Sequence, residues 1–378
     1  MFVANWVLKL KPSATADDSD NYIFQKIIKT EWRNLFAEKK FLILAVVFAL
    51  LIAYGISSGA NWIGERRTQS FDLLAAVFSQ TDGKIVEREE YTFSTAFVGE
   101  ITKTKPAEKP IFENTKIKKI TYLSDNLKIK GFVAMPKKAG KFPVIIYNRG
   151  GNREFGQLNE FELYFMAKFA DWGYVVIGSQ YRGCCGSEGK DEFGGKDLND
   201  VLNLIPALND IPEADAGRIG MWGWSRGGMM TFLALTQTDK IRAAVVGAPA
   251  INQFSNLKRK DGVGFEKSVF AELIPDYAQN KDAELKKRSP VFWTEKIPKT
   301  VPILLMQGSS DWRVLAEDTF GFIEKLYRQK NPVKLIFYPG ADHGIREYRD
   351  ETNEQTKAWF DKYVRDKSPL PDMELHGR

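Results

Sequence analysis

The sequence predicts an α/β fold in which a mostly parallel, eight-stranded sheet carries helices on both faces. Two observations lead to this prediction. From residue 142 onward, short and continuously apolar runs alternate with longer segments whose apolar residues recur at helical spacing. Strands that are buried on both faces have this composition, and the helices between them make the crossovers that parallel strands require. Two more strand-like runs precede the first helix, so we expect the sheet to begin with an antiparallel pair.

The individual elements follow from the same pattern. The first two expected strands span residues 117–123 and 127–136 and are joined by a turn at Ser124, Asp125 and Asn126. The later strands span residues 142–147, 174–179, 218–223, 241–247, 301–307 and 333–338. The expected helices span residues 160–172, 195–208, 226–236, 316–328 and 353–365. Segment 251–290 is longer than an ordinary connection, so it forms either a helical cap above the carboxyl edge of the sheet or a peripheral excursion.

Composition narrows the classes of function. The 378 residues are 44% hydrophobic and carry a formal net charge of +6, from 54 basic and 48 acidic residues spread along the chain. A mild and dispersed positive charge does not favour a nucleic-acid partner. The sequence has only two histidines, His343 and His376, which excludes a histidine-rich metal site, and the adjacent Cys184 and Cys185 are not a metal-ligand set. We therefore expect no metal and no cofactor.

The N-terminal part of the chain has the pattern of a membrane anchor. From Tyr22 to Phe36, apolar residues recur at helical spacing among basic ones, which is typical of an amphipathic helix that lies on a membrane surface or packs on the domain. No charged residue lies between Phe41 and Gly64. As a helix this stretch would be about 36 Å long, enough for a hydrocarbon core of ~30 Å. A cleaved signal peptide is the alternative, although a leader of about 40 residues is long for that class.

These observations divide the chain into five parts. More Lys and Arg precede the apolar stretch than follow it, so the positive-inside rule predicts a cytoplasmic N-terminus and an extracytoplasmic main domain. The parts are a cytoplasmic tail with the amphipathic helix (1–40), a single-pass membrane anchor (41–64), a connector (65–114), the α/β domain (115–366) and a C-terminal tail (367–378).

A nucleophile-elbow pattern lies in the middle of the α/β domain. Gly223, Ser225 and Gly227 form Gly-x-Ser-x-Gly between an expected strand and an expected helix. The sharp turn strains the backbone of the serine and raises its hydroxyl above the sheet, and the glycines avoid clashes with neighbouring elements. Alone the pattern is a weak signal, because a glycine-rich turn whose serine caps a helix has the same residues.

Asp311 and His343 complete a predicted catalytic triad in the chain order Ser, Asp, His. Each follows the end of an expected strand, so both lie at the same edge of the sheet as Ser225. His343 would act as the base, and Asp311 would hold its tautomer and stabilise the imidazolium. Asp342 is a competing acid, but a direct neighbour of His343 points away from its imidazole. Asp311 has the alternative roles of stabilising a loop or pairing with Arg313.

The donors for a developing oxyanion are expected on two segments. One is the backbone N–H of Arg226, directly after the nucleophile, and the other comes from the loop after strand 142–147, which contains Arg149, Gly150 and Gly151. The paired glycines permit close approach of the backbone to a substrate oxygen. An ordinary Gly-Gly turn is the alternative reading.

As a set, these motifs resemble the catalytic domain of the prolyl oligopeptidase family, in the α/β-hydrolase superfamily. The similar stretches are 223–228, 127–136, 181–183, Gly308 with 311–314, and 342–344, and the catalytic residues are separated by 86 and 32 positions. The resemblance covers roughly residues 117–364 and implies an α/β-hydrolase fold and serine peptidase activity. Residues 182–189 are also similar to a loop of the X-Pro dipeptidyl-peptidase and cocaine-esterase group.

Two departures from that family affect the prediction. Only about 50 residues separate the apolar stretch from the first expected strand, so the β-propeller that commonly precedes this domain does not fit there. Arginine stands at position 149, where the family commonly has an aromatic residue or a histidine, and at position 226, where an aromatic residue is common.

The sequence thus predicts a membrane-anchored serine hydrolase that acts on a small peptide or ester through an acyl-enzyme. The resemblance favours peptide bonds, and a carboxylesterase with the same triad is the close alternative. A non-catalytic, membrane-anchored binding protein that has kept the fold is a second alternative. The anchor is also compatible with a place in a transporter assembly.

Overall fold

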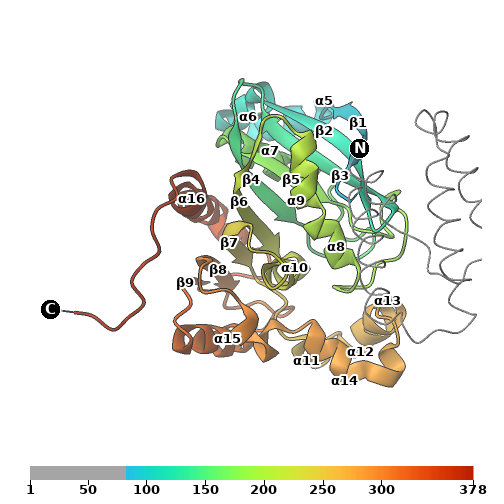
Figure 1. The fold of residues 1–378 in the computed structure, drawn as a ribbon, viewed down its shortest axis with the longest axis vertical. Helices are drawn as coiled ribbons and strands as arrows, with labels where there is room; N and C mark the ends of the chain where they lie inside the picture. The colour runs from blue at the N-terminus through green and yellow to red at the C-terminus, as the bar shows by residue number, and fades with distance from the viewer. Residues whose placement is uncertain (1–81, 378) are drawn as a thin grey trace, which may run out of the picture. The chain divides into compact units, whose positions relative to one another are not determined.

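The computed structural model describes residues 82–377, which form one nine-stranded sheet (Figure 1). The strand order is β1-β2-β3-β5-β4-β6-β7-β8-β9. The strands β5, β4 and β6 to β9 run parallel, whereas β1, β2 and β3 are joined antiparallel to one another and to β5. The strands are β1 (Ile85–Tyr91), β2 (Thr115–Ser124), β3 (Leu127–Pro136), β4 (Phe142–Asn148), β5 (Val175–Ser179), β6 (Ala214–Trp224), β7 (Ile241–Gly247), β8 (Ile303–Gly308) and β9 (Val333–Tyr338).

The prediction of eight strands was wrong by one. The extra strand, β1, lies in the segment that was expected to be a connector, together with helices α5 (Thr95–Thr104) and α6 (Lys109–Asn114). Five consecutive residues of β1 are exposed, because it is an edge strand that only β2 covers on one side. Glu89 and Glu90 of β1 pair with Lys119 and Lys118 of β2. A charged edge strand has no apolar alternation, so hydrophobic periodicity does not detect it.

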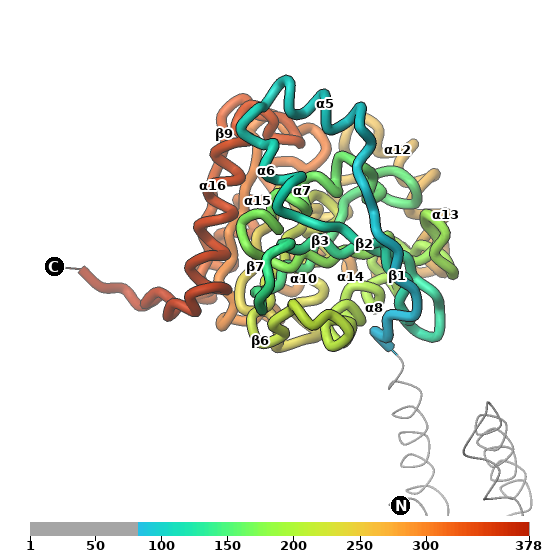
Figure 2. Tube along the Cα trace, turned by 90° about the horizontal axis from the view of Figure 1, so that it is seen from above, coloured from blue at the N-terminus to red at the C-terminus, as the bar shows by residue number. Residues whose placement is uncertain are grey.

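Helices cover both faces of the sheet, and each face has its own core. On one face the core includes Val201, Phe232 and Phe322, from α8 (Asp197–Leu202), α10 (Arg226–Leu235) and α15 (Ala316–Arg328), together with α9 (Leu204–Ala207). On the other face it includes Met166 and Phe360, from α7 (Glu160–Asp171) and α16 (Arg349–Phe360), together with α6. Figure 1 shows α8 and α10 in front of the sheet, and Figure 2 shows α16 along the side of the domain. The predicted α/β-hydrolase arrangement of a parallel sheet between two helical layers is confirmed.

The antiparallel start of the sheet has the turn that its sequence predicts. Strands β2 and β3 pair from Thr115 with Pro136 to Ser124 with Leu127. The two residues between them, Asp125 and Asn126, both have positive φ, at 50° and 62°. Two-residue hairpins favour this conformation because its twist matches that of the strands, and Asp and Asn tolerate it.

Segment 251–290 contains four short helices at the carboxyl edge of the sheet. They are α11 (Gln253–Asn256), α12 (Gly262–Phe265), α13 (Ala271–Leu273) and α14 (Tyr277–Lys287), with a π-helical turn at Glu266–Phe270. Phe270, Ile274 and Leu285 are buried in the core shared with α10. The segment is therefore packed on the domain, and Figure 1 shows it next to α8 and α10.

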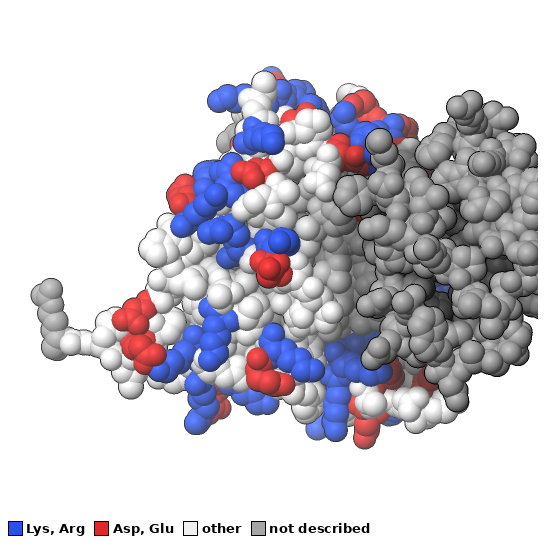
Figure 3. Space-filling model, viewed as in Figure 1, with Lys and Arg blue, Asp and Glu red and all other residues white. Residues whose placement is uncertain are grey.

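A disulfide bond, a C-terminal segment and a mixed-charge surface lie outside this core. Cys184 and Cys185, in the loop after β5, form a disulfide bond between neighbouring residues. After α16 and the π-helical turn at Asp361–Arg365, residues 367–377 form no helix or strand and extend away from the domain in Figures 1 and 2. On the face shown in Figure 3, acidic and basic side chains are interspersed among neutral ones.

The expected amphipathic helix within residues 1–40 and the expected anchor at residues 41–64 lie outside the described residues. Among the helices of residues 82–377, none combines the length and the apolar character needed to cross a membrane.

Candidate active site

Ser225 stands at a sharp turn between β6 and α10. Its backbone has φ 57° and ψ −120°, a strained conformation for a residue with a side chain. A Cβ atom on Gly223 would lie 2.2 Å from the carbonyl oxygen of Gly227, and one on Gly227 would lie 1.9 Å from that of Asn148. Both glycines are therefore required by the close approach of α10 to β6 and β4. The local geometry is that of the elbow predicted from Gly-x-Ser-x-Gly.

Asp311 and His343 are brought together by the loops that follow β8 and β9. The Nδ1 atom of His343 lies 2.7 Å from Oδ2 of Asp311. A carboxylate only accepts hydrogen bonds, so Nδ1 carries the proton and Nε2 is left free to accept one. The other oxygen of Asp311 accepts the backbone N–H groups of Arg313 and Val314, at 2.8 and 3.0 Å. These bonds fix the carboxylate in a buried position facing the imidazole.

The competing acid Asp342 has a different partner. Its Oδ1 accepts the backbone N–H of Gly344 at 2.8 Å, and its side chain is exposed. Gly308, at the end of β8, lies against the carbonyls of Ala341 and Asp342, where a Cβ would come within 2.6 Å of both. This close approach brings the loop of His343 onto the loop of Asp311.

Ser225 and His343 line the same cavity, which has a volume of about 680 Å³. No hydrogen bond joins the hydroxyl of Ser225 to His343 in this structure, although such bonds commonly tighten only when substrate binds. The indole of Trp224 donates a hydrogen bond of 2.8 Å to the backbone carbonyl of His343. The residue before the serine therefore holds the histidine loop beside the elbow.

The loop after β4 lies against the elbow. A Cβ on Gly150 would lie 3.1 Å from the carbonyl oxygen of Trp224 and 3.5 Å from Cβ of Ser225. Neither the backbone N–H of Gly150 nor that of Arg226 donates to an acceptor among residues 82–377, and the first N–H groups of a helix have no partner within it. Both expected backbone donors are therefore free beside the serine.

The side chain of Arg149 binds backbone carbonyls of neighbouring loops. Its guanidinium is buried, and it donates to the carbonyl of Gln180 at 2.6 and 3.0 Å and to that of Arg153 at 2.9 Å. It also lies over the ring of Tyr181, 4.8 Å from the ring centre. Burial lowers the pKa of Arg149 to about 10. Arg149 thus ties the loop after β4 to the end of β5, and its side chain is not turned toward an oxyanion.

Arg226 is the centre of a buried ion-pair cluster that the sequence analysis missed. Its guanidinium pairs with Asp191 at 2.7 Å and Asp197 at 2.6 Å, and all three side chains are at most 2% exposed. It also donates to the carbonyl of Gly151 at 2.9 Å, while Asp191 accepts the backbone N–H of Arg153. The cluster joins the first turn of α10 to the loop after β4. No motif marks the two aspartates in the sequence, so only the fold shows their role.

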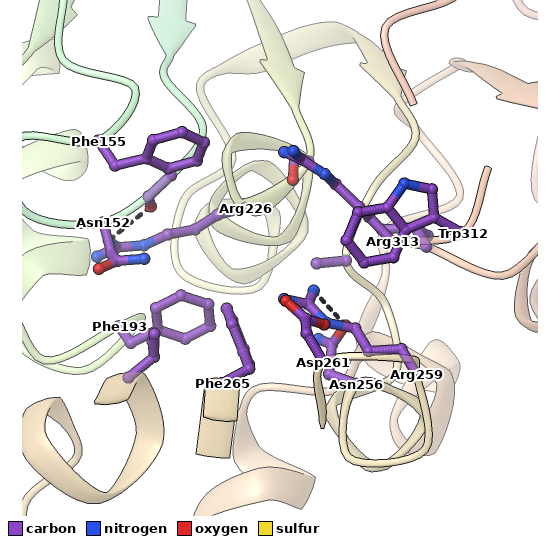
Figure 4. Close-up of a pocket in the computed structure, with 15 residues that line it drawn as sticks. Asn152, Phe155, Phe193, Arg226, Asn256, Arg259, Asp261, Phe265, Trp312 and Arg313 are labelled. Atoms are coloured by element: carbon purple, nitrogen blue, oxygen red, sulfur yellow. Dashed lines mark hydrogen bonds and ion pairs between the residues drawn. The ribbon is translucent and has the colours of Figure 1, made fainter. Parts of the chain in front are cut away.

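Ser225 also lines a second, smaller cavity of about 250 Å³. Figure 4 shows the residues around it. Phe193 and Phe265 pack edge to face in its wall, with their ring centres 6.1 Å apart, and Arg226 reaches along it from α10. Segment 251–290 supplies Phe265, Val269 and the ion-paired Arg259 and Asp261. Trp312 and Arg313 approach from the loop of Asp311 (Figure 4). Segment 251–290 thus forms one wall of a cavity that opens beside the serine.

The arrangement around Ser225 agrees with the comparison to known families. The sequence pattern of the prolyl oligopeptidase family matches residues 158–367, more than half of the chain. The chain belongs to the prolyl oligopeptidase family. This match covers the elbow and the loops of Asp311 and His343. Together with the relatives described next, it identifies the protein as a serine-type hydrolase.

Among curated relatives, the uncharacterized peptidase YtmA of Bacillus subtilis is 28% identical over 233 residues, which are 61% of this chain and 87% of YtmA. The acylamino-acid-releasing enzyme of Sus scrofa is 28% identical over 204 residues, 50% of this chain and 27% of that enzyme. This prolyl oligopeptidase family member therefore spans most of YtmA but only about a quarter of the pig enzyme.

Solved structures show the same fold. An acylaminoacyl peptidase in complex with Z-Gly-Gly-Phe-chloromethyl ketone has a TM-score of 0.58 and 25% identity, over 68% of this chain and 43% of that one. A putative dienelactone hydrolase from Klebsiella pneumoniae has a TM-score of 0.50 and 18% identity, over 66% of this chain and 99% of that one. The second likeness concerns the fold alone. Within residues 82–377, no group of three or more His, Cys, Asp or Glu side chains is arranged to hold a metal ion.

Proposed function

We propose that this protein hydrolyses peptide bonds through an acyl-enzyme on Ser225, with His343 as base and Asp311 as its orienting acid. The observation that carries the proposal is the bond of 2.7 Å between Nδ1 of His343 and Asp311. It leaves Nε2 as the proton acceptor in the cavity that Ser225 also lines. Membership of the prolyl oligopeptidase family supports the peptide bond as substrate.

The reaction has two halves. The hydroxyl oxygen of Ser225 attacks the carbonyl carbon while its proton passes to Nε2 of His343. The imidazolium then donates that proton to the leaving amine as the C–N bond breaks, and a water molecule, deprotonated by the same histidine, hydrolyses the ester. The backbone N–H groups of Gly150 and Arg226 support the oxyanion of each tetrahedral intermediate. In this scheme Arg149 positions the Gly150 loop through its contacts to Gln180 and Arg153.

The leaving group and the acyl part of the substrate bind in different cavities. The leaving group receives its proton from His343, so it lies on the side of that residue, and His343 lines the larger cavity but not the smaller. The acyl part then occupies the smaller cavity. Phe193, Phe265 and Val269 in that wall favour an apolar acyl side chain. The acylaminoacyl peptidase solved with Z-Gly-Gly-Phe-chloromethyl ketone makes phenylalanine a suitable first choice.

The test compares two series of chromogenic substrates with the same acyl parts. Phenylalanyl and N-acetylphenylalanyl p-nitroanilides report amide hydrolysis, and the corresponding p-nitrophenyl esters report ester hydrolysis. We expect hydrolysis of both, labelling by a fluorophosphonate probe, and a loss of about 10⁴-fold or more in kcat for Ser225→Ala. Full activity of Ser225→Ala would contradict the role of the serine. If the enzyme cleaves the esters but none of the amides, the result would favour a carboxylesterase. If the probe does not label the protein, the result would favour a non-catalytic binding protein.

We also propose that residues 41–64 anchor the chain in a membrane with the hydrolase domain on the extracytoplasmic side. The support is the uncharged apolar stretch and the excess of basic residues before it. When the full chain is expressed in bacteria, it should stay with membranes in alkaline carbonate, and added protease should reach the domain in intact spheroplasts. Recovery of the full chain in the soluble fraction would contradict the anchor.

A further inference from the structure

We propose that the larger cavity selects substrates whose leaving group carries a carboxylate, so that the enzyme releases an amino acid or short peptide with a free C-terminal acid. The inference rests on the proposed function, because it uses Ser225 as nucleophile and His343 as the donor to the leaving group. It adds the chemical class of the substrate on that side of the scissile bond.

Three arginines that have no carboxylate partner in the described part of the chain line the larger cavity. Arg313 comes from the loop of Asp311, Arg346 from the turn at Arg346–Tyr348, and Arg349 from the first residue of α16. None of the three side chains forms an ion pair or a hydrogen bond with residues 82–377. By contrast, the buried Arg182, Arg226 and Arg288 are each paired with a carboxylate.

The other charges that line this cavity already have partners. Lys168 pairs with Glu108 at 2.7 Å, and Lys105 lies 3.9 Å from the same carboxylate. Arg149 donates to backbone carbonyls. The acidic residue in the lining is Glu162, whose Oε2 accepts the hydroxyl of Tyr147 at 2.5 Å. Burial raises the pKa of Glu162, while the hydroxyl of Tyr147 and the charge of Arg349 lower it.

The guanidinium groups of Arg346 and Arg349 therefore form no ion pair with the described residues on the same side of Ser225 as His343, although the charges of Glu162 and Asp342 act on Arg349. Arginine matches a carboxylate with two parallel donors, and such charge-assisted bonds are stronger than neutral ones. Arg349 is held in place because it lies over the ring of Phe165, 4.8 Å from the ring centre, and it is partly buried. A peptide leaving group offers a carboxylate at its C-terminus, which can lie within reach of these groups while its amine receives the proton from His343.

The walls between Ser225 and these arginines are aromatic. Trp222, Trp224, Phe161 and Phe165 line the same cavity, and Phe161 is 48% exposed. Apolar walls with a few charged groups at one end are typical of sites that bind amphipathic small molecules. The leaving group that fits best is therefore an apolar amino acid, or a short peptide ending in one, with its α-carboxylate free.

The bonds and protons of this reaction are those of the proposed mechanism. The acyl carbon forms a bond to the oxygen of Ser225, and its bond to the leaving nitrogen breaks. That nitrogen takes the serine proton through His343 and leaves as an amine, while the carboxylate stays ionised throughout. Water then releases the acyl group as an acid, so no further reactant is required.

The test uses furylacryloyl-Phe-Phe and its C-terminal amide, which differ only in the charge of the leaving group. We expect the wild type to hydrolyse the free acid about tenfold faster or more, in kcat/KM, than the amide. In Arg346→Gln/Arg349→Gln the ratio of the two rates should fall to about one. The exposed Arg346→Gln alone should lower the ratio in part and keeps the packing of Arg349. Arg328→Gln, on the outer face of α15, is the matched control and should keep the wild-type ratio.

The ratio is measured within one preparation, so partial unfolding of a variant changes both rates equally and does not mimic the effect. The carboxylate inference is overturned if the wild type cleaves the two substrates equally, or if the double variant keeps the wild-type ratio. Neither result contradicts the proposed catalytic triad. A wild type that cleaves neither substrate also overturns the carboxylate inference. If the fluorophosphonate probe fails to label the wild type as well, the proposed function falls with it.

Discussion

The indole Nε1 of Trp224 donates a hydrogen bond of 2.8 Å to the backbone carbonyl of His343. The two residues are 119 positions apart; Trp224 is the last residue of β6, and His343 lies in the loop after β9. Trp224 precedes the serine, so this bond connects the residue that shapes the elbow with the loop that carries the imidazole. The separation between hydroxyl and imidazole therefore depends on a group that takes no part in proton transfer.

Trp224→Phe removes this bond and keeps an aromatic ring. We expect kcat to fall about tenfold to a hundredfold because the histidine loop loses its tether, while the free energy of unfolding falls by only about 1 kcal/mol. Steady-state kinetics and thermal unfolding measure the two effects. Trp359→Phe is the control, because its indole donates to the carbonyl of Pro302 away from the site. An equal loss of kcat in both variants would contradict the tether.

Asp311→Asn should lower kcat about 10⁴-fold, because an amide at this position favours the wrong tautomer of His343. Protein folding should be little affected, since the amide oxygen can still accept the backbone N–H groups of Arg313 and Val314. Asp342→Asn changes the neighbouring exposed carboxylate, which accepts only the N–H of Gly344. It should stay within about threefold of the wild type. A larger loss for Asp342→Asn than for Asp311→Asn would reverse the assignment of the acid.

Asp191→Asn should destabilise the fold by about 3–5 kcal/mol near neutral pH, because it leaves the buried Arg226 with a weaker partner. Burial by itself raises the pKa of Asp191, but Arg226 and two backbone N–H groups outweigh it and lower the pKa to about 2. Because its pKa is lower in the folded protein than in the unfolded chain, where it is near 4, ionised Asp191 stabilises the fold at pH values above about 4. This stabilisation is lost as the pH falls toward 2.

The difference in unfolding free energy between wild type and Asp191→Asn should therefore shrink between about pH 4 and pH 2. Urea titrations across this range measure it. Asp239→Asn, whose partner Lys240 is exposed, should change stability by less than about 0.5 kcal/mol at any pH. A constant difference for Asp191→Asn down to pH 2 would contradict the ion pair.

Gly227→Ala tests the contact between α10 and β4. The new Cβ would lie 1.9 Å from the carbonyl oxygen of Asn148, so the helix or the strand must move. We expect a loss of activity of at least about a hundredfold and lower stability. Gly321→Ala, in the middle of α15, places its Cβ in open space and should stabilise the protein by about 0.5–1 kcal/mol. Wild-type kinetics in Gly227→Ala would show that the contact is not needed.

Much of the fold could be predicted because its strands are apolar and its helices periodic. Strand β4 is buried from Pro143 to Asn148, and helix α15 presents Phe322 and Leu326 to the core at a spacing of four. Strand β1 could not be predicted in this way, because its residues are charged and it is held by main-chain pairing with β2. Residues 195–208 were predicted as one helix, but the structure divides them into α8 and α9 at Asn203.

Some residues of the candidate site could likewise be predicted from the sequence, and others could not. Ser225, Asp311 and His343 could be chosen from the chain order and from their places after strands, since those ends meet at one edge of a parallel sheet. The partners of Arg149 and Arg226 could not, because they come from loops whose course depends on packing. Asp191 lies 35 positions before Arg226, in a segment without a motif.

By itself, the sequence determined the order along the chain of the strands from β2 to β9, and the three residues of the candidate triad. It could do so because hydrophobic periodicity and the residues of a sharp turn are local properties of a chain. Only the tertiary structure decided which side chains line the two cavities. It also decided that, within residues 82–377, Arg226 is ion-paired while Arg346 and Arg349 are not, and that Trp224 holds the loop of His343. These depend on contacts between distant residues, which form only when the sheet brings the carboxyl ends of its strands together.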